Sequence, residues 1–191
     1  MDLSSFFIYC IIATFTPGPT NILILSTVTS AGTGRAMKFS YGSAVGFGLL
    51  LVLSAALNTL LLTVMPRILV VMQLAGSLYM VCLAYRMVKK NTSPKAVNQT
   101  ASFLSGFVLQ FLNPKTVLFA MTVLPTFIMP YYSGLSMVSL SILVITLIGF
   151  SAFLTWVLFG AVFKEFLHKH HTAVNLIMAL FLAYAAIMIW E

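Results

Sequence analysis

Two short groups of residues interrupt long apolar runs of this chain, and both are built around proline. The first reads Thr16-Pro17-Gly18-Pro19-Thr20-Asn21, and the second reads Gln110-Phe111-Leu112-Asn113-Pro114-Lys115. Proline has no N–H to donate, so each group opens helical hydrogen bonds. In a bilayer, opened backbone must be satisfied by neighbouring protein or by a water-lined cavity. Two such breaks, in matching places of two halves, indicate the substrate site of a transporter.

The first break is expected to unwind the chain at mid-membrane depth. Pro17 and Pro19 cannot bond the carbonyl groups one turn earlier, which belong to Ala13 and Phe15. Gly18 between them adopts conformations that other residues resist. These freed carbonyls are candidate partners for the ammonium group of a substrate.

The residues that flank this unwound stretch are polar. Pro17 disfavours helical geometry at Thr16. We expect Thr20 and Asn21 to cap the half-helix that follows. The N–H groups at the start of that half-helix would then attract a carboxylate or a phosphate.

The second break combines a proline with two amide side chains and a cation. Asn113 directly precedes the proline, Gln110 lies one helical turn earlier, and Lys115 follows. Pro114 frees the carbonyl of Gln110, and Asn113 can bond exposed backbone. Lys115 is the one charged residue expected deep in a span, where a lysine costs roughly 2.5–3.5 kcal/mol. An inward position, near a substrate carboxylate or paired with carbonyls, is therefore expected. The alternatives are that Pro114 only kinks the helix and that Lys115 snorkels to the interface.

The amino-acid composition indicates an integral membrane protein, so both breaks are expected to lie within the membrane. Of the 191 residues, 61% are hydrophobic and only 7% are charged, too few for the surface of a soluble domain. The apolar runs are continuous and long enough to cross a bilayer as helices. The net charge of +7 comes from basic residues between these runs, where they orient a membrane protein, so no nucleic-acid partner is expected. His168, His170 and His171 have no cysteine or aspartate nearby, so a solvated basic loop is expected rather than a metal site.

Six candidate spans follow from the apolar runs: 4–30, 38–63, 67–87, 103–124, 134–163 and 172–190. Pro125 and Pro130 are expected to close the fourth. We predict an all-α membrane protein with one domain, 1–191, in which repeat halves 1–88 and 102–191 are joined by a basic linker, 89–101. Each half has three spans, so the halves are inverted relative to each other, and helices 1 and 4 are the broken ones.

Basic residues predict the orientation. One side of the predicted membrane receives Arg35, Lys38, Arg86, Lys89, Lys90, Lys95, Lys164 and Lys169. The other side receives only Arg67. Short loops rich in lysine and arginine face the cytoplasm. We therefore expect a multi-pass protein of the cytoplasmic (inner) membrane with both termini outside. Asp2 and the lack of a basic residue before the first apolar run indicate a permanent first span rather than a signal peptide.

These residues resemble the motifs of the lysine-exporter (LysE/RhtB) family of amino-acid efflux proteins. Residues 16–21 are similar to that family's first-helix motif, with Thr20 where Asn is usual, and residues 111–115 to its fourth-helix motif. The nearest likeness is to the cysteine/O-acetylserine exporter branch. Some members carry an acidic residue at the position of Phe47, and none is available in these spans, so a neutral substrate is favoured over lysine.

The resemblance implies secondary-active efflux of small neutral amino acids or their metabolites, coupled to the proton-motive force and without a cofactor. The expected binding residues are Thr16, Pro17, Gly18, Pro19, Thr20, Asn21, Gln110, Asn113, Pro114 and Lys115. The expected partners are the substrate, the lipid bilayer and a second copy of the chain, should it form a homodimer. The alternatives are a passive small-solute channel and an exporter of homoserine, threonine or leucine. Clustered catalytic side chains are missing from the spans, so no enzyme is expected.

Overall fold

The structure is a computed structural model that describes residues 2–57, 70–71, 74, 76–82, 84–85, 88, 101–132 and 134–188. All regular structure in this part of the chain is helical. Residues 89–100 of the predicted linker 89–101, the lone basic residue Arg67 and much of the third span lie outside the described residues.

The first predicted span consists of two helices. Helix α1 covers Leu3–Phe15, helix α2 covers Pro19–Ala31, and the two axes are bent by 46° at the break. The side chain of Asp2 accepts a hydrogen bond from Ser4 N and so caps α1. Thr16 is extended, with φ −61° and ψ 145°, as expected for a residue that precedes a proline.

The expected cap of α2 was wrong. Gly18 is the N-cap, Pro19 is the first helical residue, and no side chain caps this end. Proline fits the first helical position because its fixed φ is helical and its missing N–H would have had no partner there. Thr20 and Asn21 therefore lie inside the first turn of α2, where their side chains are free to bond elsewhere.

The fourth predicted span is broken in the same way. Helix α6 covers Phe103–Leu112, helix α7 begins at Pro114, and the bend between them is 67°. Asn113 is the extended residue between the two helices, with φ −91° and ψ 103°. At the start of α6, Ser102 and Ser105 bond each other's backbone reciprocally, which fixes the point where the helix begins.

Pro125 does not end this span, contrary to expectation. Helix α7 ends at Val123 and continues as a π-helical turn, η1, over Leu124–Ile128. The wider turn shifts hydrogen bonding to a five-residue spacing, as in the bond from Met129 N to Leu124 O. This widening accommodates a proline that has no N–H, and helical structure stops just before Pro130.

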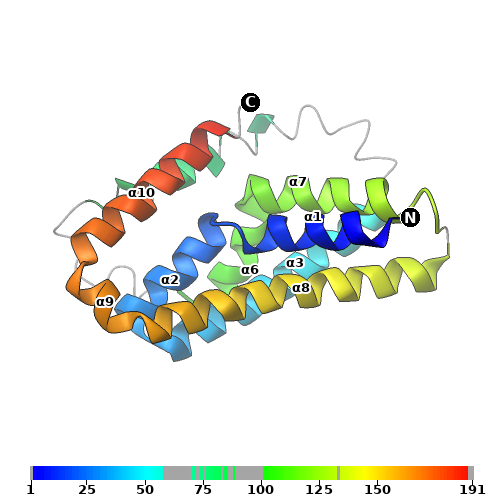
Figure 1. The fold of residues 1–191 in the computed structure, drawn as a ribbon. Helices are drawn as coiled ribbons and strands as arrows, with labels where there is room; N and C mark the ends of the chain where they lie inside the picture. The colour runs from blue at the N-terminus through cyan, green and yellow to red at the C-terminus, as the bar shows by residue number, and fades with distance from the viewer. Residues whose placement is uncertain are drawn as a thin grey trace.

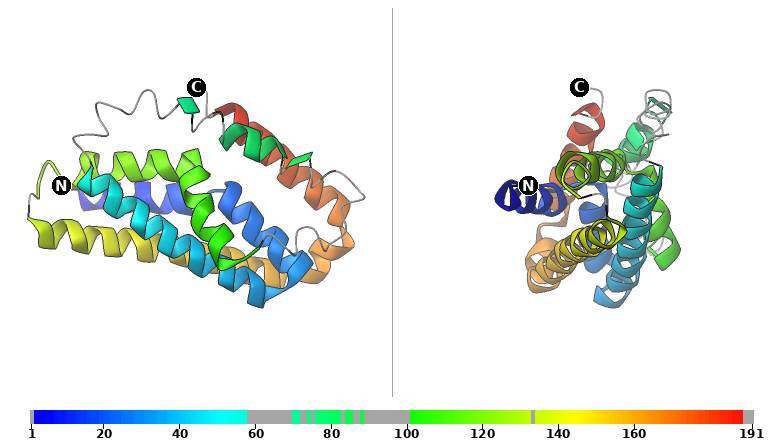
Figure 2. Two further views of the ribbon diagram at one scale, coloured as in Figure 1. Left: turned by 180° about the vertical axis from the view of Figure 1, so that it is seen from behind. Right: turned by 90° about the vertical axis from the view of Figure 1, so that its right-hand side faces the viewer.

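The remaining helices are α3 at Thr33–Ala56, α8 at Leu135–Val162, α9 at Lys164–Lys169 and α10 at His171–Met188. Helices α3 and α8 are long, pack against each other and run in opposite directions (Figure 1). Helices α2 and α7 leave the region of the breaks toward opposite ends of the molecule (Figure 1). Beside α10 lie helical residues of the third predicted span, where Ser77 Oγ donates to Ala186 O at 3.2 Å (Figure 2).

The helices agree with a multi-pass membrane protein. Helices α3 and α8 are each long and apolar enough to span a membrane, and each bent pair passes the same test as one broken span. These make up to four spans among the described residues. The six-span count and the inverted repeat stay predictions.

Glycines allow a close contact between helices α3 and α6. A Cβ atom at Gly42 would lie 1.9 Å from the carbonyl oxygen of Phe103, and one at Gly106 would lie 2.2 Å from that of Phe39. Both helices therefore depend on glycine to approach this closely. This contact holds the first half of the chain against the start of α6, and so against the second break.

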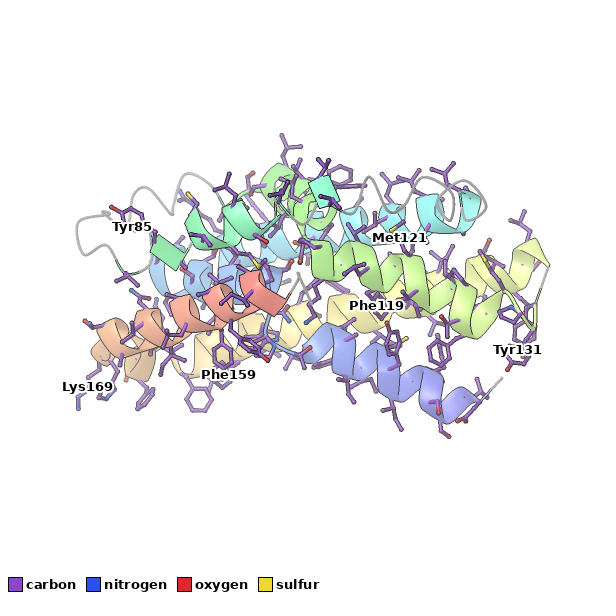
Figure 3. The ribbon with its side chains drawn as sticks, turned by 90° about the horizontal axis from the view of Figure 1, so that it is seen from above. Tyr85, Phe119, Met121, Tyr131, Phe159 and Lys169 are labelled. Carbon is purple, nitrogen blue, oxygen red and sulfur yellow. The ribbon has the colours of Figure 1, made fainter. Side chains whose placement is uncertain are left out.

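The two ends of the molecule differ in charge. Lys169 lies at the end where α9 follows α8, and Tyr131 lies at the opposite end, near the chain's N-terminus (Figures 1 and 3). Arg35 and Lys38 belong to the first turns of α3, beside α9. Arg35, Lys38 and Lys169 thus lie toward one end of the molecule, and Tyr131 lies at the other.

Candidate functional site

The two breaks meet in the interior of the protein. Gln110 Nε2 and Asn113 Nδ2 both donate to Thr20 Oγ1, at 3.3 Å and 3.2 Å. All three side chains are buried. Residues about 90 positions apart in the sequence thus form one polar cluster.

Lys115 makes a second connection between the broken helices. Its Nζ donates to Thr16 O at 3.0 Å and to Thr16 Oγ1 at 2.8 Å. The aliphatic part of Lys115 crosses Gly18, where a Cβ atom would lie 3.2 Å from Lys115 Cδ. Lys115 therefore points inward, between the two halves, as expected. An ammonium group has three donors, so one remains after the two bonds to Thr16.

Asn21 bonds the end of α1. Its Nδ2 donates to Thr14 O at 3.0 Å and to Thr16 O at 2.9 Å. These carbonyls belong to the last turn of α1 and to the residue after it, where the helix has no donors of its own. The side chain expected to cap the helix that follows instead satisfies the helix that precedes it.

Trp156 satisfies another carbonyl that the first break sets free, and the sequence did not single it out. From α8, its Nε1 donates to Phe15 O at 3.2 Å. This carbonyl was expected to be open to a substrate ammonium and is instead occupied. The available signal was a tryptophan well inside an apolar span, because a buried indole N–H needs a partner.

Among the described residues, three carboxamide oxygens around the breaks have no hydrogen-bond partner. They are Asn21 Oδ1, Gln110 Oε1 and Asn113 Oδ1, and all are buried. The amide orientation is fixed for two of them, since Asn21 Nδ2 faces backbone carbonyls and Gln110 Nε2 faces Gly106 O at 3.2 Å. Buried acceptors without protein donors are costly, so these oxygens are available to a donor from a ligand.

The three residues that carry these oxygens line a common cavity of about 40 Å³. Its lining comes from both breaks and from α3, α7 and α8: Ala13, Thr14, Gly18, Thr20, Asn21, Phe47, Gln110, Asn113, Lys115, Thr116, Phe119, Gly149 and Phe153. This volume holds a few water molecules.

Two helix N-termini add positive potential at this cavity. Helices α2 and α7 both begin at the breaks with a proline, and no side chain caps either end. The first turn of a helix leaves N–H groups without intrahelical partners and carries the positive end of the helix dipole. None of the acidic residues that the structure describes lines the cavity. The site therefore combines a cation and two positive helix ends with neutral acceptors, which suits a zwitterion.

The comparison with protein families decides which kind of protein carries this cavity. Residues 11–190 match the model for LysE type translocators. The chain belongs to the LysE family. It is 32% identical over 98% of its length, and over 97% of theirs, to the cysteine/O-acetylserine efflux proteins of Escherichia coli K12, Shigella sonnei and Shigella flexneri. No solved structure matches the chain.

Membership in the LysE family makes the chain a membrane transporter rather than an enzyme. Of the expected binding residues, six line the cavity of this LysE-family protein: Gly18, Thr20, Asn21, Gln110, Asn113 and Lys115. Four do not line it: Thr16, Pro17, Pro19 and Pro114. Thr16 anchors Lys115, and Pro19 and Pro114 begin α2 and α7. Contact of any of these residues with substrate stays a prediction.

Proposed function

We propose that this LysE-family protein exports small neutral amino acids, of the cysteine or O-acetylserine kind, across the cytoplasmic membrane. The observation that carries the proposal is the cavity between the breaks. It brings the Lys115 ammonium together with three unpartnered carboxamide oxygens. The relatives named for cysteine and O-acetylserine efflux support the substrate class.

The substrate carboxylate binds on the side of Lys115. One donor of its ammonium remains free beyond the two bonds to Thr16. The first-turn N–H groups of α2 and α7 add further donors, and such helix ends attract anions. This arrangement resembles the carboxylate sites that discontinuous helices form in other transporters.

The substrate ammonium binds to the carboxamide oxygens of Asn21, Gln110 and Asn113 rather than to backbone carbonyls. The carbonyls of Thr14, Phe15 and Thr16 already accept bonds from side chains. The three amide oxygens lack donors, and an ammonium group supplies three. Neutral acceptors hold a zwitterion's ammonium without favouring a substrate that carries a second positive charge.

Transport proceeds by alternating access, in which one half rocks against the other around the site. Every polar contact between Thr20 and the second break, and between Lys115 and the first, crosses from one half of the chain to the other. Such contacts can re-form as the halves move. Coupling to the proton-motive force is part of the proposal, and Lys115 is the titratable group at the cavity that could take part.

We further propose an inner-membrane location with both termini outside, and a homodimer as the assembly to test first. The basic residues Arg35, Lys38, Lys164 and Lys169 support the orientation, because they belong to the end that would face the cytoplasm. A reporter fused after Glu191 that behaves as cytoplasmic would contradict it.

Counterflow in proteoliposomes tests the function. The purified protein is reconstituted with an internal amino acid, and accumulation of the labelled external one is followed for cysteine, O-acetylserine, serine, homoserine, threonine and leucine, with and without a pH gradient. We expect saturable exchange of the small neutral members and a response to the gradient. Flux that never saturates would favour the passive channel, and absence of flux for the whole panel would remove the proposal.

A further inference from the structure

One wall of the cavity is aromatic, and its position depends on a glycine. Phe47 of α3, Phe119 of α7 and Phe153 of α8 line the cavity and are buried. The rings of Phe47 and Phe119 lie 5.8 Å apart between centroids, at an angle of 35°. Neither ring nor the ring of Phe153 offers a hydrogen-bond partner, so this wall is suited to the apolar part of a ligand.

Gly149 provides the space that Phe47 occupies. A Cβ atom at Gly149 would lie 2.6 Å from Phe47 Cε1 and 2.8 Å from Phe47 Cδ1. Any side chain at position 149 would therefore push the ring away from α8. The ring itself is only 3% exposed, so it has little other room except the cavity.

The aromatic wall lies where the side chain of a bound amino acid would be placed, because the polar groups of the cavity bind its carboxylate and ammonium. In the proposed function, on which this inference rests, Lys115 takes the carboxylate and the carboxamides take the ammonium. The substrate's side chain must then lie against the remaining lining, which is the aromatic wall. The depth available there fixes the length of side chain that fits.

We propose that Phe47, held in position by Gly149, is the specificity-determining residue that restricts this transporter to amino acids with short side chains. A shorter residue at position 47 deepens the cavity, and a bulkier residue at position 149 makes it shallower. A methylene group in an apolar pocket discriminates by roughly 10- to 200-fold. The two substitutions are thus expected to shift substrate preference in opposite directions.

The test measures exchange rates of alanine, serine and leucine in proteoliposomes that contain the full-length protein. Phe47→Leu should raise the rate for leucine relative to serine by about tenfold or more. Gly149→Ala should lower the rate for serine relative to alanine. The matched control for the first variant is Phe39→Leu, which shortens a buried phenylalanine of the same helix that does not line the cavity.

Gly160→Ala is the control for Gly149→Ala, because a Cβ atom there would meet Val28 and Leu25 at 3.0–3.1 Å rather than a cavity residue. The inference is overturned if Phe47→Leu leaves the ratio of leucine to serine exchange unchanged, or if a variant and its control shift the ratios equally. In either case, exchange by the wild type leaves the proposed function standing. If the wild type exchanges no amino acid, both fail. Should Phe47→Leu not reconstitute, Phe47→Met and the Gly149 variant decide the outcome by the same ratios.

Discussion

Replacing Lys115 by methionine should remove carboxylate recognition while the protein stays folded. Methionine keeps the length and apolar body of the side chain that crosses Gly18. The variant loses the two bonds from Nζ to Thr16, at 3.0 Å and 2.8 Å. It also relieves the cost of a lysine at membrane depth, roughly 2.5–3.5 kcal/mol. Because charged hydrogen bonds are worth about 1.5–3 kcal/mol each, the two effects partly offset.

The expected loss of substrate affinity follows from the free energy of one charged hydrogen bond. One charge-assisted bond from Lys115 to the carboxylate is worth about 1.5–3 kcal/mol, and a factor of ten corresponds to about 1.4 kcal/mol. We therefore expect Lys115→Met to weaken apparent affinity for serine by roughly 10- to 150-fold. Lys115→Arg keeps the charge and should recover part of this loss.

The assay is a thermodynamic double cycle, in which the protein and the ligand are changed separately and in combination. Inhibition of labelled-serine exchange is measured for serine and for serine amide, which keeps the ammonium and lacks the carboxylate. Lys115→Met should weaken inhibition by serine and leave inhibition by the amide nearly unchanged. Thr16→Val is the control, because it removes only the side-chain contact of Lys115 and keeps its charge. Equal weakening for both ligands would show that Lys115 acts through the fold, and would refute the carboxylate contact.

Three further substitutions test how the breaks are stabilised, each by thermal unfolding in detergent. Asn21→Ala removes both donors to the end of α1 and should cost about 1–3 kcal/mol, whereas Asn21→Asp should cost more because a carboxylate faces carbonyl oxygens. Unchanged melting in both would contradict the capping role. Trp156→Phe leaves a carbonyl of α1 without its donor and should cost about 1–3 kcal/mol; an unaltered Tm would mean that water replaces the indole. Gly42→Ala should prevent α3 from approaching Phe103 and abolish folded protein, whereas Gly34→Ala, with nothing within 4 Å, should be tolerated. Similar yields of the two glycine variants would exclude the close contact.

Local sequence was sufficient for some features of the site because proline acts through its own backbone. The positions of the two breaks and the extended Thr16 were predicted from a missing N–H and from the clash between a proline and the residue before it. The start of α2 at Pro19 was not predicted, because Thr20 and Asn21 were expected to cap that helix. The inward position of Lys115 followed from the energetic penalty of a charge in lipid.

The sequence by itself therefore determined that the chain is an apolar helical protein with two broken helices and a cation at the second break. Only the tertiary structure decided which groups those breaks leave open. Partners of a freed carbonyl can come from any helix that packs nearby. Here Trp156 occupies the carbonyl of Phe15, which a substrate was expected to meet, and Asn21 occupies those of Thr14 and Thr16. The carboxamide oxygens of Asn21, Gln110 and Asn113 remain open because packing brings no donor from the described residues to them. Proximity of that kind depends on packing between helices, which no local pattern encodes.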